Sequence, residues 1–203
     1  MKRYKNMKKL GFIIIVSCLF VSACTTQTEK SVENKSVNTT NVAKPETNTA
    51  KPETSSFPAM PNDILQAEMK TLDGKSFKLG DQKDKILLVS LWATWCQPCL
   101  KEMPEIQKLN DEFKDKGFEA VGVTFINEDN SDKQVRDFLK EKKFTYTQVL
   151  SNEKTWDAML ELSKAPGIPV NFIVSKDGKI LETLVGGKSY EVFKTAIEKS
   201  FSK

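Results

Sequence analysis

The chain has 203 residues, of which 39% are hydrophobic and 29% charged, and its formal net charge is +4. Five of its 31 basic residues lie among the first nine positions and no acid precedes Cys24, so residues 24–203 carry a net charge of −1 and no nucleic-acid-binding surface is expected. Histidine is absent, which excludes Ser-His and Cys-His catalytic pairs, His-ligated metals and Cys-x-x-Cys-His haem attachment.

The N-terminal segment has the pattern of a bacterial secretory signal. Residues 10–21 form an apolar run of 12 residues, shorter than the roughly 20 that a membrane-spanning helix needs. The small residues Ser22 and Ala23 follow this run and precede Cys24. Val-Ser-Ala-Cys resembles the lipobox of bacterial lipoproteins, which implies cleavage before Cys24 and a diacylglyceryl group on its sulfur. The alternative is an uncleaved anchor in which Cys24 is incidental. In either case the remainder is expected outside the cytoplasm, tethered to a membrane of the bacterial cell envelope.

Residues 24–57 are expected to be a lipidated N-terminus followed by a disordered spacer. Positions 25–57 contain 12 Ser or Thr, four Asn, four charges of each sign and no Gly. The unit Ala-Lys-Pro-Glu-Thr occurs at 43–47 and again at 50–54, which is typical of low-complexity sequence. So few apolar side chains cannot form a core. We therefore predict a signal peptide at 1–23, this spacer at 24–57, and a folded domain at 58–203.

The first half of the folded domain predicts a hairpin, a buried strand and a helix. Short alternating runs on either side of Asp73-Gly74 predict a hairpin over 71–77. Residues 86–92 are nearly all apolar, as expected for a strand covered on both faces of a parallel sheet. Apolar residues at helical spacing follow, interrupted by Pro104, which is expected to kink the helix.

Strands and helices continue to alternate in the second half of the domain. Further strands are predicted at 118–125, 144–150, 170–174 and 179–185, the last two flanking an Asp-Gly turn. Helices are predicted after a capping box at Ser131, around Trp156, and after Ser189. The residues expected to face inward on the last helix are Val192, Phe193, Ala196, Ile197 and Phe201. This order predicts an α/β sandwich in which helices flank a central mixed β-sheet.

The two cysteines of the domain are candidates for redox chemistry. If Cys18 leaves with the signal peptide and Cys24 carries lipid, as the lipoprotein resemblance implies, Cys96 and Cys99 remain. A disulfide closing so short a loop stabilises a fold very little. The pair lies at the start of the predicted helix, where the helix N-terminus stabilises a thiolate. Cys96 comes first and is expected to be better exposed, so we predict that it attacks a disulfide and that Cys99 resolves the mixed disulfide. No cofactor is expected.

Residues 58–203 resemble the thioredoxin superfamily, and within it the extracytoplasmic TlpA/ResA-type thiol-disulfide oxidoreductases. The resemblance rests on Leu-Val-Ser-Leu-Trp-Ala-Thr-Trp-Cys-Gln-Pro-Cys at 88–99, on Pro104, and on Gly-Ile-Pro at 167–169. It implies a thioredoxin-like fold that has a central mixed β-sheet flanked by helices, an N-terminal hairpin, and an inserted strand and helix at 118–142.

The resemblance also implies which residues contact a client protein. In this family the Gly-Ile-Pro segment forms a cis-proline loop that faces the active site and pairs with the substrate backbone. The expected client-contacting residues lie in that loop or beside the cysteines: Trp95, Gln97, Pro98, Ile168 and Pro169. For Trp95, simple packing is the alternative.

A carboxylate near the cysteines is a further expectation. Thioredoxin has a buried Asp at the position that Ser90 occupies here, and Ser cannot serve as a carboxylate proton acceptor. Family members of this subtype place a carboxylate three residues after the second cysteine, which is Glu102 in this chain. Burial would raise the pKa of Glu102 and let it take the proton of Cys99. The alternative is a solvated carboxylate near the helix N-terminus.

The expected function is the reduction of disulfides in exported client proteins, and several alternatives compete with it. The nearest is a disulfide oxidase or isomerase of the same fold. A metal-binding module would need a Cys₄ site shared between two chains, so no metal site is expected. A non-catalytic surface lipoprotein is a third class. A thiol peroxidase is disfavoured because Ala93 stands where that family has Thr or Ser. The resemblance offers apocytochrome c and an exported methionine sulfoxide reductase as clients, with a transmembrane thiol carrier as electron donor.

Overall fold

The computed structural model describes residues 57–202, so the predicted signal peptide, Cys24 and almost the whole spacer lie outside the described residues. Within 57–202 a single seven-stranded sheet has the order β2-β1-β5-β4-β3-β6-β7. Its strands are β1 (Met69–Thr71), β2 (Ser76–Phe77), β3 (Ile86–Leu91), β4 (Phe118–Phe125), β5 (Thr147–Ser151), β6 (Val170–Val174) and β7 (Ile180–Val185). The central strands β3, β4 and β5 are parallel and the remaining pairs are antiparallel, which confirms the predicted mixed sheet.

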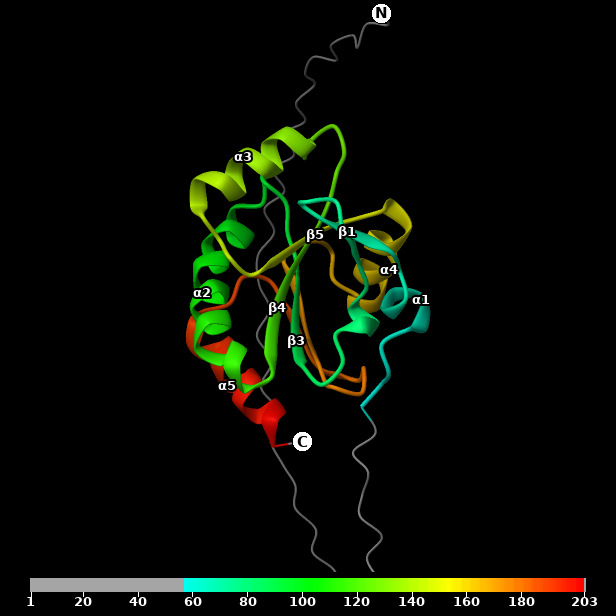
Figure 1. The fold of residues 1–203 in the computed structure, drawn as a ribbon, viewed down its shortest axis with the longest axis vertical. Coiled ribbons are helices and arrows are strands. Elements are labelled where there is room, and N and C mark those ends of the chain that lie inside the picture. Colours follow the sequence, from blue (N-terminus) through cyan, green and yellow to red (C-terminus); the bar gives the residue numbers. More distant parts are fainter. Residues whose placement is uncertain (1–56, 203) are drawn as a thin grey trace, which may run out of the picture. The chain divides into compact units, whose positions relative to one another are not determined.

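Helices cover both faces of this sheet. They are α1 (Asn62–Leu65), α2 (Gln97–Phe113), α3 (Asp132–Lys142), α4 (Glu153–Ser163) and α5 (Tyr190–Phe201), with 3₁₀ turns η1 (Leu79–Asp81) and η2 (Lys114–Lys116). Helices α2, α3 and α5 lie on one side of the sheet, and α1 and α4 lie on the other (Figure 1). Among residues 57–202, none of these helices has the length and apolar character needed to cross a bilayer.

Strand β3 carries the core on both of its faces. All six of its residues are buried, and alternate side chains point to opposite layers. Ile86 and Leu88 pack in the cluster under α2 and α5, whereas Leu87 and Val89 pack in the cluster under α1 and α4. Burying one such aliphatic side chain contributes roughly 1.5–3 kcal/mol, so both layers hold β3 in place. The segment that leads to Cys96 therefore begins at the end of a strand that is packed on both faces.

Most of the predicted elements are confirmed, including the hairpin at Asp73-Gly74, the strand at 118–125 and the capping box at Ser131. Pro104 lies inside α2, which continues to Phe113. The strand predicted at 144–150 begins only at Thr147, and the helix around Trp156 extends over 11 residues.

Helix α5 begins after Ser189, as predicted, and Ser189 is its N-cap residue, although the Ser189 side chain makes no capping hydrogen bond. Two residues that were expected to face inward on this helix are exposed instead. Val192 is 43% exposed, because the buried stripe of α5 runs through Phe193, Ala196 and Ile197, and Val192 lies about 100° away from Phe193 around the helix. Phe201 is also partly exposed, although its ring stacks on that of Phe113.

Candidate active site

The cysteine pair lies at the N-terminus of α2, immediately after the loop that leaves β3. Cys96 is the N-cap residue of this helix, and its Sγ accepts a hydrogen bond of 3.3 Å from the backbone N–H of Cys99. The two cysteines form a disulfide, with their Cα atoms 5.3 Å apart. The same helix-terminal N–H groups stabilise negative charge, so they favour a thiolate on Cys96 once the disulfide is reduced.

The surroundings of the disulfide differ in exposure. Cys96 is 3% exposed and Cys99 is fully buried, so the predicted difference between them has the right direction but is small in the oxidised protein. Trp95 is 55% exposed, and Gln97 and Pro98 are also exposed. These three exposed side chains therefore form the accessible surface beside Cys96.

The Gly-Ile-Pro segment lies at the same end of the sheet as the cysteines. Strand β6 pairs antiparallel with β3, and Leu91 is opposite Val170, so Pro169 lies beside the start of the active-site loop. The Ile168-Pro169 peptide bond is cis, as the resemblance implied. Ile168 is half-buried and Pro169 is buried.

The loop between β7 and α5 completes this end of the molecule. The backbone N–H of Gly186 donates a hydrogen bond of 2.9 Å to the carbonyl of Pro169. A Cβ atom on Gly187 would lie 3.4 Å from the Cβ of Pro98, so this loop lies next to the first turn of α2. The helix N-terminus, the cis-proline loop and residues 186–188 thus meet around the disulfide.

Glu102 lies one turn after Cys99 and is only 2% exposed, so the solvated alternative is wrong. Its Oε1 accepts a hydrogen bond of 3.0 Å from Asn171 Nδ2, and its Oε2 accepts one of 3.0 Å from the backbone N–H of Lys188. Burial raises the pKa of Glu102 to about 7, against the opposing effects of Asn171, Lys188 and the Ser90 hydroxyl. A carboxyl group with this pKa can both take and release a proton near neutral pH.

Asn171, Lys188 and Asn130 were not anticipated from the sequence. Asn171 and Lys188 contact Glu102, and Asn130 bonds to Thr94 in the active-site loop. One signal was available for Asn171, since it is the single polar residue of the apolar strand Val-Asn-Phe-Ile-Val. A polar residue in such a strand is buried and needs a partner.

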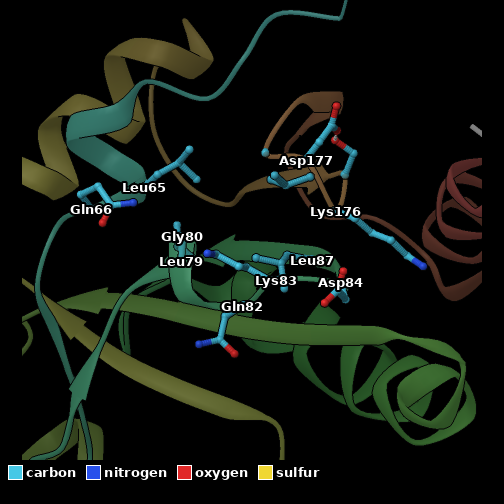
Figure 2. A pocket seen from close by; sticks show the side chains of 13 residues that line it. Leu65, Gln66, Leu79, Gly80, Gln82, Lys83, Asp84, Leu87, Lys176 and Asp177 are labelled. Carbon is cyan, nitrogen blue, oxygen red and sulfur yellow. Dashed lines mark hydrogen bonds between the residues drawn. The ribbon is translucent and has the colours of Figure 1, made fainter.

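Apart from the disulfide, residues 57–202 contain a pocket but no cluster of metal ligands. Among these residues, no three His, Cys, Asp or Glu side chains gather as metal ligands would. A pocket of about 350 Å³ is lined by residues that include Leu65, Leu79, Leu87 and Lys176 (Figure 2). Leu87 belongs to the beginning of β3 whereas Cys96 follows its end, so this pocket is at the opposite end of the sheet from the disulfide.

Comparisons with known proteins agree with this geometry. The chain matches the Redoxin family over residues 46–197. Thiol-disulfide oxidoreductase ResA of Bacillus cereus (strain ZK / E33L) is 30% identical over 128 residues, which cover 63% of this chain and 70% of the relative. Sporulation thiol-disulfide oxidoreductase A of Bacillus subtilis (strain 168) is 29% identical over 137 residues, covering 68% of this chain and 79% of that protein.

Solved structures share the fold. StoA from Bacillus subtilis has a TM-score of 0.53 at 27% identity and covers 64% of this chain and 94% of its own. A thiol:disulfide interchange protein from Bacteroides sp. has a TM-score of 0.61 at 26% identity, covering 72% of this chain and 91% of its own. Because these relatives are disulfide-exchange proteins and Cys96 and Cys99 form a disulfide here, the chain belongs to the Redoxin family and is a thiol-disulfide oxidoreductase of the TlpA/ResA type in the thioredoxin superfamily.

Proposed function

We propose that this oxidoreductase reduces disulfides in exported client proteins, with Cys96 as nucleophile, Cys99 as resolving thiol and Glu102 as proton acceptor. The observation that carries the proposal is the Cys96–Cys99 pair at the start of α2, with the buried carboxyl group of Glu102 one turn further on. The helix N-terminus activates the first thiol, and the carboxylate activates the second.

The reaction has two exchange steps. The Cys96 thiolate attacks a client disulfide, forming a mixed disulfide and releasing one client thiolate. Cys99 then gives its proton to Glu102, and its sulfur attacks the sulfur of Cys96. The Cys96–client bond breaks, the client leaves with both electrons, and the Cys96–Cys99 disulfide forms. Each cycle therefore ends in the oxidised state, and a thiol donor must reduce the pair again.

Client contact is assigned to the side chains around the disulfide. The exposed Trp95, Gln97 and Pro98 offer an accessible surface, and Ile168 and Pro169 border it on the β6 side. Aromatic side chains such as Trp95 contribute large contact areas at protein interfaces. An extended client segment that lies along Ile168-Pro169 would bring its disulfide toward Cys96.

The location and the partners are proposals that rest on the N-terminal sequence. Cleavage before Cys24 and lipidation of its sulfur would tether the folded domain at 58–203 to the cell envelope through the spacer at 24–57. Clients of the proposed class are apocytochrome c and an exported methionine sulfoxide reductase. Compartments outside the cytoplasm are oxidising, so a transmembrane thiol carrier is the proposed electron donor.

Client trapping tests this proposal. In Cys99→Ala the mixed disulfide has no resolving thiol, so we expect covalent client complexes that mass spectrometry identifies and that a reductant releases. Cys96→Ala is the matched control and should trap none. Equal trapping by both variants, or none by Cys99→Ala, would contradict the assigned roles.

A further inference from the structure

Asn171 is a polar residue in a strand that is otherwise apolar. All five residues of β6 are buried, and the other four are Val170, Phe172, Ile173 and Val174. A buried amide destabilises a fold unless its polar atoms find partners. A branched apolar residue at this position would match the rest of the strand and avoid that cost.

The Asn171 side chain has one hydrogen-bonding partner among residues 57–202, and that partner is Glu102. Its Nδ2 donates to Glu102 Oε1 at 3.0 Å, whereas its Oδ1 is buried without a partner in the described part of the chain. A native structure contains few such unpartnered atoms, and each one calls for an explanation. The interaction with Glu102 is the available explanation for keeping the amide.

The fold brings the two donors to Glu102 from different sides. Asn171 pairs with Ser90 across the β3–β6 ladder, so its amide reaches the carboxyl group from the sheet. The backbone N–H of Lys188 reaches the other oxygen from the β7–α5 loop. Because each oxygen has its own donor, the orientation of the Glu102 carboxylate is fixed on α2.

We propose that Asn171 is a positioning residue, which holds the Glu102 carboxylate in the ionised, proton-accepting form one turn from Cys99. This inference rests on the proposed role of Glu102. In the resolving step, the Cys99 thiol gives its proton to Glu102 and its sulfur attacks Cys96 of the mixed disulfide. The Cys96–Cys99 bond forms, the Cys96–client bond breaks, and the electron pair leaves on the client sulfur, which takes a proton from water.

Burial and groups from three neighbouring elements set the protonation of Glu102. Burial is the largest effect and raises its pKa, while Asn171 from β6, Lys188 from the β7–α5 loop and Ser90 from β3 lower it. Tyr146, just before β5, is buried, and the charge of Glu102 contributes to raising the pKa of that phenol. On α2 itself, the ionisable side chains within one turn of Glu102 are Cys99, Lys101 and Glu105, of which Lys101 is exposed and Glu105 is half-buried. Removing the Asn171 amide leaves burial unchanged and takes away a donor, so the pKa of Glu102 must rise.

The direct test measures the pKa of Glu102 by carboxyl carbon-13 NMR in the oxidised, full-length protein. Asn171→Leu removes the donor at similar volume, and we expect the midpoint to rise by about one to two pKa units. Asn171→Thr keeps a hydroxyl donor on a residue suited to a strand, and it should restore part of the shift. Asn110→Leu is the control. It removes a buried amide on α2 that does not contact Glu102, since the Asn110 Oδ1 accepts a hydrogen bond from the N–H of Ala120, and it should leave the midpoint unchanged.

A kinetic arm separates this inference from the role of Glu102. The rate at which Cys99 resolves a preformed mixed disulfide on Cys96 is measured from pH 5 to 9 by release of a small thiol. Asn171→Leu should move the midpoint of this profile upward by the shift seen in NMR, and Glu102→Gln should abolish the midpoint. A profile unchanged by Glu102→Gln would refute the role of Glu102. An unchanged NMR midpoint in Asn171→Leu would overturn the positioning role of Asn171, whatever the rates.

Discussion

Asn130 joins the active-site loop to the end of β4 through Thr94. The Oδ1 of Asn130 accepts hydrogen bonds from the backbone N–H of Thr94 at 2.9 Å and from its hydroxyl at 2.8 Å. Its Nδ2 donates to the Thr124 hydroxyl at 2.9 Å and to the Phe125 carbonyl at 2.7 Å. The amide is buried and uses both of its donors and its acceptor oxygen. This arrangement fixes the loop that contains Trp95 and leads into α2.

Replacing Asn130 should therefore loosen the client surface as well as destabilise the fold. Asn130→Ala leaves the Thr94 N–H and the Phe125 carbonyl without their side-chain partner, so we expect the free energy of unfolding to fall by roughly 2–3 kcal/mol. Denaturant unfolding of the oxidised protein measures this change. Thr94→Val, which removes only the hydroxyl bond, should cost about 1 kcal/mol. Equal stability of Asn130→Ala and the wild type would show that the hydrogen bonds of Asn130 do not hold the active-site loop in place.

Buried strands could be predicted from the sequence, whereas contacts between residues far apart along the chain could not. Strands β3, β4 and β6 were predicted because short, mostly apolar runs are typical of buried strands. The partners of Glu102 were not, because Asn171 lies 69 residues away along the chain and Lys188 lies 86 residues away. Spacing within one element carries no information about which side chains meet across the fold. The burial of Glu102 was anticipated through the resemblance alone.

Burial of Glu102 should make stability depend on pH. The pKa of its carboxyl group is about 7 in the folded protein against 4.5 for the exposed group, so the folded state binds the proton more tightly. Its contribution is fully present below pH 4.5 and is lost as pH rises through 7, a decrease of about 3 kcal/mol at 1.36 kcal/mol per pKa unit. Denaturant unfolding of the oxidised protein from pH 4 to 9 measures it.

Glu102→Gln is the matched comparison, since the amide keeps the shape of the neutral acid and does not titrate. The difference between the two stability curves isolates Glu102, because exposed acids whose pKa is lowered, such as Asp73 at about 2, titrate at more acidic pH. Parallel curves between pH 5 and 8 would show that the folded and unfolded proteins bind this proton equally well.

The proposed lipidation of Cys24 predicts how the protein fractionates. Cys24→Ala should either release the domain from membranes or leave the signal peptide uncut, because the modified sulfur is required for lipoprotein processing. Membrane extraction and gel mobility of the two proteins measure this in cells. Cys18→Ala is the control, since that residue lies within the predicted signal peptide. If Cys24→Ala keeps the extraction behaviour and the mobility of the wild type, the anchor is not a lipid on this cysteine.

The direction of electron flow follows from the charges around the nucleophile. Strong oxidants such as DsbA stabilise the reduced form by lowering the pKa of the attacking thiol to about 3.5. Here the residues between the cysteines are Gln97 and Pro98, which carry no charge, so the N-terminus of α2 stabilises the Cys96 thiolate without help from them. We therefore expect the pKa of the Cys96 thiol to be higher than that of the attacking thiol in DsbA, and the disulfide to be harder to reduce than the DsbA disulfide.

Equilibration with glutathione redox buffers should give a potential nearer the roughly −270 mV of thioredoxin than the roughly −120 mV of DsbA. Gln97→His is an informative partner variant, because an imidazolium beside Cys96 would favour its thiolate and should raise the potential. In cells, alkylation of free thiols should show that Cys96 and Cys99 of the wild-type protein are mostly reduced. A reductase can act only while an electron donor keeps its cysteine pair reduced. A potential above about −150 mV, together with a cysteine pair that is mostly oxidised in cells, would contradict the reductase function. The protein would then be an oxidase or isomerase of the same fold, because its disulfide would pass to client thiols.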